Sequence, residues 1–172
     1  MNCPFCEYTN IQGSRVCDQC GQPIDDLHLS DPESALERGL LADRIEELSP
    51  KAPITVTSDA TVGDVLNLLF QQSIGCVFVL DENRHPIGVF SERDATRAAE
   101  AIATSRDRPI VDFMTPNPQG LSAEAKIAFA VHQMDLGGYR HLPIINAHGQ
   151  ADGVISVRDI LRYLTEKANA SV

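Results

Sequence analysis

A repeat at an offset of 65 residues constrains the fold of this chain more than any other feature of its sequence. Residues 88–94 (GVFSERD) align without a gap on residues 153–159 (GVISVRD), with Gly, Val, Ser, Arg and Asp in register. The same offset places Pro53 on Pro118 and Val62 on Ile127. Chance rarely gives such a match over this length, so the chain contains two copies of one structural unit.

Each copy shows the same predicted order of elements. In copy one, the extended segment Ile54–Val56 precedes a helix whose apolar residues keep helical spacing over residues 62–70. A buried strand, a polar turn at residues 81–83 and a second strand follow, and the second strand leads into another helix. In copy two the matching helix runs through Ile127, Val131 and Met134, with Gly137-Gly138 as its stop. The pattern predicts an α/β (α+β) fold, β-α-β-β-α twice, and two such small units would cover their sheets by packing as a pseudo-twofold pair.

The chain before the repeats divides into two further parts. Residues 31–48 are predicted to form one amphipathic helix, which Ser49-Pro50 would end. Its apolar stripe consists of Leu36, Leu40, Leu41, Ile45 and Leu48. The expected organisation is therefore a four-cysteine segment at 1–30, a linker helix at 31–50, motif one at 51–109 and motif two at 110–172.

Two Cys-x-x-Cys pairs lie within the first 20 residues, Cys3 with Cys6 and Cys17 with Cys20. Each pair in a tight turn presents two thiolates, and two such turns supply the four soft ligands of a tetrahedral metal ion. Gly21 would permit the sharp backbone path after the second pair. So short a segment with few apolar residues could scarcely fold without a metal. The pattern predicts a metal site, with zinc as the usual occupant.

Other interpretations of the cysteines are weaker. Disulfides conflict with the cytoplasmic setting that the chain's beginning, without a basic and apolar leader, predicts. A redox pair would need a strand-to-helix turn. The segment resembles a zinc ribbon or the knuckles of rubredoxin, but Glu7 stands where those iron knuckles have glycine, which favours zinc over iron. Cys76, in an apolar run, is interpreted as a core residue.

Both copies carry Ser-x-x-Asp where a strand turns into a helix: Ser91 with Asp94, and Ser156 with Asp159. One interpretation is a capping box, worth about 1 kcal/mol. The other is a nucleotide site, because a helix N-terminus favours phosphate and a carboxylate one turn in can accept both hydroxyls of a ribose. The residues alone leave both open.

Several linked motifs identify a family. The repeat resembles a pair of cystathionine-β-synthase-type (CBS) domains, the arrangement called a Bateman module, over about residues 45–164. The resemblance rests on PITV at 53–56, DATV at 59–62 and GVFSERD at 88–94. In copy two it rests on FMTP at 113–116, GYRHLPI at 138–144 and GVISVRDIL at 153–161.

The resemblance implies an adenosine ligand, AMP, ADP, ATP or S-adenosylmethionine. It implies that Asp94 and Asp159 take ribose hydroxyls and that Ser91 and Ser156 approach phosphate. In copy two the implied site also includes Tyr139, Arg140, His141 and Arg158. Copy one has Gly75 and Cys76 where copy two has Arg140 and His141, so we expect the Asp159 pocket to be the better one. Gly120 in copy two either opens room for a base or weakens its strand.

Charge and motifs exclude several function classes. The net charge is −10 and no basic stripe is visible, so nucleic acid is an unlikely partner. No apolar run approaches the length of a membrane span. No catalytic motif appears, so we do not expect an enzyme. The resemblance implies a regulatory nucleotide sensor and, by analogy with the family, a homodimer, while the acidic cysteine segment is suited to protein contact. The alternatives are a dimerisation scaffold without ligand and an iron-knuckle electron carrier.

Overall fold

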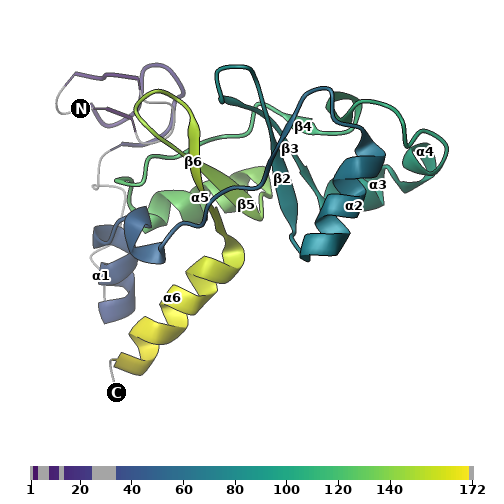
Figure 1. Cartoon of the computed structure of the whole chain (residues 1–172). Helices are drawn as coiled ribbons and strands as arrows, with labels where there is room; N and C mark the ends of the chain where they lie inside the picture. The colour runs from purple at the N-terminus through teal and green to yellow at the C-terminus, as the bar shows by residue number, and fades with distance from the viewer. Residues whose placement is uncertain (1, 4–7, 12–13, 25–33, 171–172) are drawn as a thin grey trace. The chain divides into compact units, whose positions relative to one another are not determined.

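The computed structural model describes residues 2–3, 8–11, 14–24 and 34–170, which fall into two compact units (Figure 1). The first unit combines described residues of the segments 1–51, 119–145 and 154–172. It therefore contains the cysteine segment, the linker and most of copy two. The second unit combines residues 52–118 with residues 146–153, and so contains copy one and the hairpin turn of copy two.

The second unit is built on a four-stranded sheet in the order β1-β2-β3-β4. The strands are β1 (Thr55–Thr57), β2 (Cys76–Leu80), β3 (Pro86–Ser91) and β4 (Thr115–Pro116). The β1 strand is parallel to β2, and the other neighbouring pairs are antiparallel. Every residue of β2 is buried, as its unbroken apolar sequence predicts for a central strand. The pairing of β4 with β3 brings the first residues of motif two onto the sheet of motif one.

Three helices and a short 3-10 turn complete this unit. They are α2 (Val62–Gln72), α3 (Glu92–Arg97), α4 (Ala99–Ala103) and η2 (Ile110–Asp112). The α2 helix begins at Thr61, whose hydroxyl accepts a hydrogen bond from the Asp64 amide at 3.1 Å. Its apolar stripe packs with β2 and β3 in a core of Val62, Val65, Leu69, Val77, Val79, Phe90, Ile102 and Ile110. The helical spacing read from the sequence therefore identified Val62, Val65 and Leu69 correctly as buried, but it was wrong for Phe70, which is 86% exposed.

The first unit contains the remaining elements. They are α1 (Ala35–Ala42), the 3-10 helix η1 (Ile45–Leu48), α5 (Ile127–Gly137), β5 (His141–Ile145), β6 (Ala151–Ser156) and α6 (Val157–Ala170). The β5 and β6 strands form a hairpin whose turn belongs to the second unit. One continuous core joins α5, β5, β6 and α6 to the linker, and it includes Cys3, Cys17 and Ile24 of the cysteine segment. The mixed α and β composition expected from the sequence is confirmed.

The first strand of copy two is reduced to a single parallel bridge between Leu121 and Ile144. The Leu121 amide donates to the Pro143 carbonyl at 3.0 Å, and the Leu121 carbonyl accepts from the Ile145 amide at 2.9 Å. A Cβ on Gly120 would lie 2.8 Å from Cγ2 of Ile145. The space beside Gly120 is therefore filled by an isoleucine side chain, so the glycine permits a close approach and does not open room for a base.

The linker is not one helix, which corrects the prediction of a helix over residues 31–48. The α1 helix begins after Ser34, whose hydroxyl and amide exchange hydrogen bonds of 3.1 Å with Glu37, and it ends at Ala42. Asp43 and Arg44 are extended. The break lets the Asp43 carbonyl accept from the Ile127 amide at 3.0 Å. Tertiary contacts thus override the helical pattern, and residues 31–33 lie outside the described residues.

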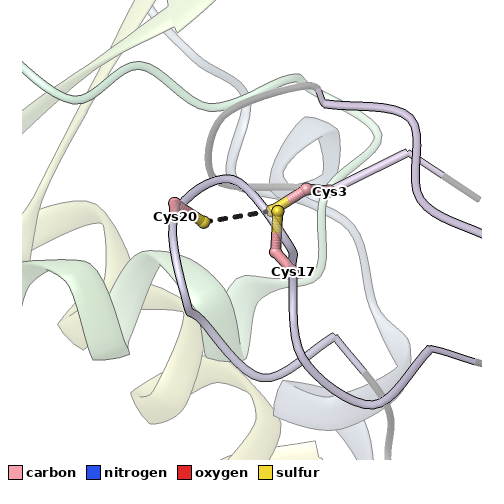
Figure 2. Close-up of side chains that lie close together, drawn as sticks. All are labelled: Cys3, Cys17 and Cys20. Carbon is pink, nitrogen blue, oxygen red and sulfur yellow. Dashed lines mark hydrogen bonds between the residues drawn. The ribbon is translucent and has the colours of Figure 1, made fainter.

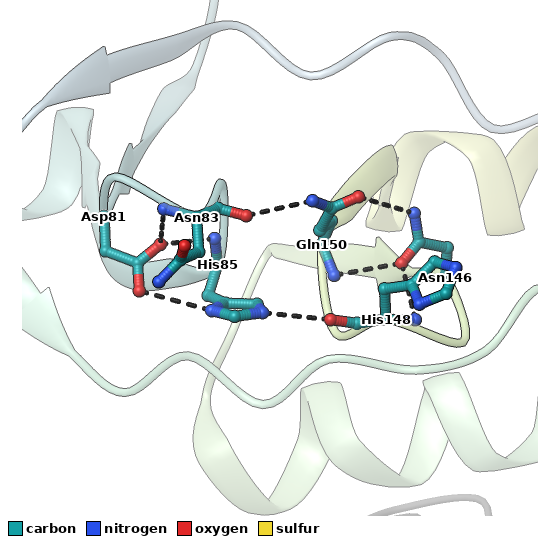
Figure 3. A network of polar contacts seen from close by, with 6 residues as sticks. All are labelled: Asp81, Asn83, His85, Asn146, His148 and Gln150. Carbon is teal, nitrogen blue, oxygen red and sulfur yellow. Dashed lines mark hydrogen bonds and ion pairs between the residues drawn. The ribbon is translucent and has the colours of Figure 1, made fainter.

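Within the second unit, the two hairpin turns contact each other, and a side chain of each turn bonds to a backbone carbonyl of the other (Figure 3). Nε2 of His85 lies 2.9 Å from the His148 carbonyl, and Nε2 of Gln150 donates to the Asn83 carbonyl at 3.0 Å. His85 and Gln150 occupy equivalent positions of the repeat, as do Asn83 and His148. The repeat therefore relates the two bonds to each other, although one side chain is a histidine and the other a glutamine.

Among the described residues, no helix combines the length and the apolar character that crossing a bilayer requires.

Candidate functional site

The first Ser-x-x-Asp pair lies in the second unit, where β3 passes into α3. Oδ2 of Asp94 accepts hydrogen bonds from the Ser91 amide at 2.9 Å and from the Ser91 hydroxyl at 2.6 Å. Oδ1 of Asp94 accepts from the Thr115 hydroxyl at 3.0 Å. Thr115 arrives because β4 pairs with β3, so a residue from the start of motif two completes the site of motif one.

The second pair has the same core geometry in the first unit, where β6 passes into α6. Oδ2 of Asp159 accepts from the Ser156 amide at 2.8 Å and from the Ser156 hydroxyl at 2.6 Å. Oδ1 of Asp159 accepts from Nη2 of Arg162 at 3.1 Å. Both serine hydroxyls donate to their own carboxylates, so a serine that donates to phosphate must first turn away from its aspartate.

The carboxylate of Asp159 is buried, with 7% of the residue exposed. Burial by itself would raise the pKa of Asp159, but the bonds from Ser156 and the charges of Lys51 and Arg162 outweigh it, so the pKa lies below its usual value. A buried aspartate that remains ionised is a strong acceptor for hydroxyl donors. Lys51 is placed beside the site by its backbone pairing with Val154 on β6.

The structure places the other predicted residues of copy two between α5 and β5, on β5 and on α6. The Arg140 carbonyl accepts from the Val157 amide at 3.0 Å, so Arg140 lies at the start of α6. The Gly75 carbonyl and the Glu92 amide make the equivalent bond in copy one, at 3.2 Å. His141 is the half-buried first residue of β5, and Arg158 is exposed on α6.

Tyr139 packs against the core of the first unit. Its ring occupies the space beside Gly137, where a Cβ would collide with it.

The N-termini of α3 and α6 offer fewer free amides than the sequence suggested. The Glu92 amide and the Val157 amide each already donate to a backbone carbonyl.

Three residues at these sites were missed from the sequence. Arg162 follows Asp159 by three positions, a helical spacing at which ion pairs form, so this signal was available. Thr115 and Lys51 reach their sites through strand pairing far along the chain, for which the sequence offers no local signal.

Cys76 is buried on β2, as predicted, and burial followed by the charge of Asp94 raises the pKa of its thiol to about 12.

Three of the four predicted metal ligands gather in the first unit (Figure 2). The sulfurs of Cys3, Cys17 and Cys20 all lie within 4.8 Å of one another, and the Cys3 and Cys20 sulfurs are 3.6 Å apart. Tetrahedral ligands with zinc–sulfur bonds of about 2.3 Å stand about 3.8 Å apart, so this separation fits a metal ion. It is far longer than a disulfide bond of about 2.05 Å. Cys6 lies outside the described residues.

Local structure explains how the cysteines are presented. The Gly21 amide donates to the Cys17 carbonyl at 2.9 Å, and Gly21 has a φ of 71°, which favours glycine. Asn10 is buried, and its side-chain Nδ2 lies 3.5 Å from the Cys17 sulfur. Its side-chain Oδ1 accepts a hydrogen bond from the Asp18 backbone amide at 2.9 Å. Two buried thiols and one exposed thiol, in a turn held by backbone bonds, suit a soft cation.

Comparison with known proteins identifies the family. The model of the CBS domain matches twice, at residues 45–101 and 110–166. The chain belongs to the CBS domain family. Each match ends within or after one Ser-x-x-Asp helix, and residues 1–44 fall outside both matches.

Individual relatives support the fold. The CBS domain protein PAE2072 from Pyrobaculum aerophilum, solved in complex with AMP, is 27% identical with a TM-score of 0.65, covering 73% of this chain and 98% of that one. An uncharacterized 17.7 kDa protein of Acidianus ambivalens is 26% identical over 73% of this chain and 76% of that protein. The inosine-5'-monophosphate dehydrogenase of Aquifex aeolicus is 28% identical, but the match covers 64% of this chain and only 22% of the enzyme. The region similar to this chain is thus most of the first two proteins and a small part of the third.

Proposed function

We propose that this CBS protein is a regulatory sensor of adenine nucleotides, which binds an AMP-, ADP- or ATP-type ligand and signals to a partner. The observation that carries the proposal is that both Ser-x-x-Asp pairs hold an acidic side chain in the same geometry at a strand-to-helix junction. The AMP complex of the Pyrobaculum protein supports an adenosine ligand. S-adenosylmethionine is the other ligand to be tested.

At the second site each group has a proposed role. Asp159 accepts the ribose hydroxyls, and Ser156 turns its hydroxyl to a phosphate at the start of α6. Arg140, His141 and Arg158 face the phosphates, and Tyr139 borders the site. At the first site Ser91 and Asp94 take the matching roles.

The second site is the better one for a charged ligand. The cation Lys51 acts on Asp159, and Arg140 lies at the start of α6. Copy one has Gly75 in place of Arg140, and the extra contact of Asp94 is the neutral hydroxyl of Thr115. A phosphate oxygen is attracted by cations in a partly buried site and gains little from a neutral hydroxyl. The proposal therefore ranks the Asp159 site above the Asp94 site.

Calorimetric titration with AMP, ADP, ATP and S-adenosylmethionine tests this function. We expect saturable binding that weakens by about tenfold or more, about 1.4 kcal/mol, in Asp159→Ala. Asp94→Ala should weaken binding less, and Asp152→Ala, which changes an exposed aspartate on β6, should leave it unchanged. Absence of heat with all four compounds, from protein with a normal circular dichroism spectrum, would leave the pairs as helix caps and favour the scaffold.

We also propose that Cys3, Cys6, Cys17 and Cys20 bind zinc. The proposal is supported by the three described thiols, whose sulfurs lie within 4.8 Å of one another, and the fourth ligand is assigned from the sequence alone. Purified protein should contain about one zinc per chain by plasma mass spectrometry and be colourless. Cys17→Ser should lose the metal, while Cys76→Ser, a buried cysteine elsewhere, should retain it. A red protein containing iron would instead support the electron carrier.

The output of the sensor is part of the proposal. We propose a homodimer in the cytoplasm that acts on a protein partner through the acidic cysteine segment, without an enzymatic activity of its own and without nucleic acid or membrane contact. Exposed apolar side chains on the helices, Phe70 at 86% and Leu136 at 61%, offer surface for a second copy. Analytical ultracentrifugation of Phe70→Ser and Leu136→Ser beside the unaltered protein measures the contribution of each helix.

A further inference from the structure

Arg162 connects the second site to the linker through a single nitrogen atom. Its Nη2 donates to Oδ1 of Asp159 at 3.1 Å and to the Leu48 carbonyl at 3.3 Å. Leu48 is the last residue of η1, where the linker ends. One guanidinium nitrogen therefore holds both the acceptor proposed for ribose and the end of the linker.

The carboxylate is buried, and its arginine partner is half exposed. The side chain of Asp159 is 9% exposed, whereas that of Arg162 is 47% exposed. Oδ2 of Asp159 already accepts two bonds from Ser156, one of them from the backbone. A carboxylate offers about four acceptor positions, and a vicinal diol needs two of them. A ribose that approaches from solvent therefore competes with Arg162 for Oδ1.

The other end of the linker is anchored to the same helix by different residues. Oδ2 of Asp43 accepts from the Tyr163 hydroxyl at 2.7 Å and lies 2.7 Å from Nζ of Lys167. Asp159, Tyr163 and Lys167 are spaced four residues apart, so they share one face of α6. The linker is thus held by α6 at two points, of which only the contact at Leu48 involves a donor that also binds the ligand site.

We propose that Arg162 is a gate at the Asp159 site, and that a ribose which displaces it releases the linker at Leu48 while the Asp43 anchor remains closed. This inference rests on the proposed nucleotide function and adds the step by which binding reaches the linker. A ligand changes this equilibrium only because it binds the open gate better than the closed one.

Hydrogen exchange with AMP as the probe tests the gate. In the unaltered protein, saturating AMP should speed amide exchange over residues 45–51 by about two- to five-fold, the effect of losing one modest hydrogen bond, and leave residues 35–43 unchanged. Arg162→Ala should show the faster exchange without AMP and no further response. It should also bind AMP about two- to five-fold more tightly, because a competing ion pair of up to about 1 kcal/mol is gone.

Arg97→Ala is the matched control, because Arg97 occupies the equivalent repeat position in motif one and is exposed. It should respond to AMP over residues 45–51 as the unaltered protein does. AMP binding without a change in exchange over residues 45–51 would refute the gate and leave the sensor intact, and so would weaker AMP binding by Arg162→Ala, which would make Arg162 a phosphate ligand. If the unaltered protein binds none of the four compounds in the calorimeter, the proposed function fails and the gate fails with it; if it binds one of them but not AMP, that compound serves as the probe.

Discussion

Replacing Asp43 with alanine should destabilise the first unit by about 2–3 kcal/mol. The Tyr163 residue is only 6% exposed, so its hydroxyl would be left buried without this acceptor, at a cost of about 1–3 kcal/mol. The pair with Lys167 adds at most about 1 kcal/mol, because the lysine side chain is 44% exposed. Asp43→Asn keeps an acceptor for the tyrosine and should cost about 1 kcal/mol.

Urea unfolding followed by tyrosine fluorescence measures this, since the chain has three tyrosines and no tryptophan. A double-mutant cycle with Tyr163→Phe isolates the hydrogen bond, and we expect a coupling energy of about 1–2 kcal/mol. If the two substitutions add to within about 0.3–0.5 kcal/mol, Asp43 and Tyr163 do not act on one another and the two-point attachment of the linker is wrong.

The pH dependence of the same contact has a definite sign. Lys167 and then Tyr163 hold the pKa of Asp43 below its ordinary value of 3.8. A carboxylate with a lowered pKa in the folded state contributes its full stability above its unfolded pKa and loses it as the pH falls through the folded value. The difference in unfolding free energy between the unaltered protein and Asp43→Ala should therefore be constant above about pH 5 and shrink below about pH 4.

Three further predictions follow from the remaining contacts. The His148 carbonyl and then Asp81 raise the pKa of His85, so its contribution is complete below about pH 6.5 and is lost as the pH rises through the folded pKa. The melting temperature of His85→Gln, measured from about pH 6 upward, should lack this decline above about pH 6.5. Because burial raises the pKa of Cys76 to about 12, iodoacetamide at pH 8 should label this thiol only after unfolding, and rapid labelling in the native state by mass spectrometry would contradict its burial. Gly120→Ala should cost about 1–3 kcal/mol in urea unfolding, because the added methyl meets the neighbouring isoleucine; an unchanged midpoint would show that this side chain moves aside freely.

The sequence by itself determined the repeated fold and the local part of each site. Helical spacing in α2 and the unbroken apolar run of β2 depend on neighbouring residues, so their buried residues could be predicted, except that Phe70 of α2 is exposed. The Ser-x-x-Asp pairs are also local, because a serine at a helix start lies within reach of the third helical residue. The repeat at 65 residues then showed that the same local arrangement occurs twice.

The tertiary structure decided which residues complete the sites and where the linker bends. Thr115 reaches Asp94 only because β4 pairs with β3, and the linker breaks at Asp43 because its backbone and side chain bond to α5 and α6. The cysteine segment shares its core with motif two, and Oε1 of Gln22 lies 3.2 Å from Nε2 of His132 on α5. These contacts join residues 20 to 120 positions apart, and no periodicity or spacing encodes them, because their free energy arises only when distant segments bury surface together.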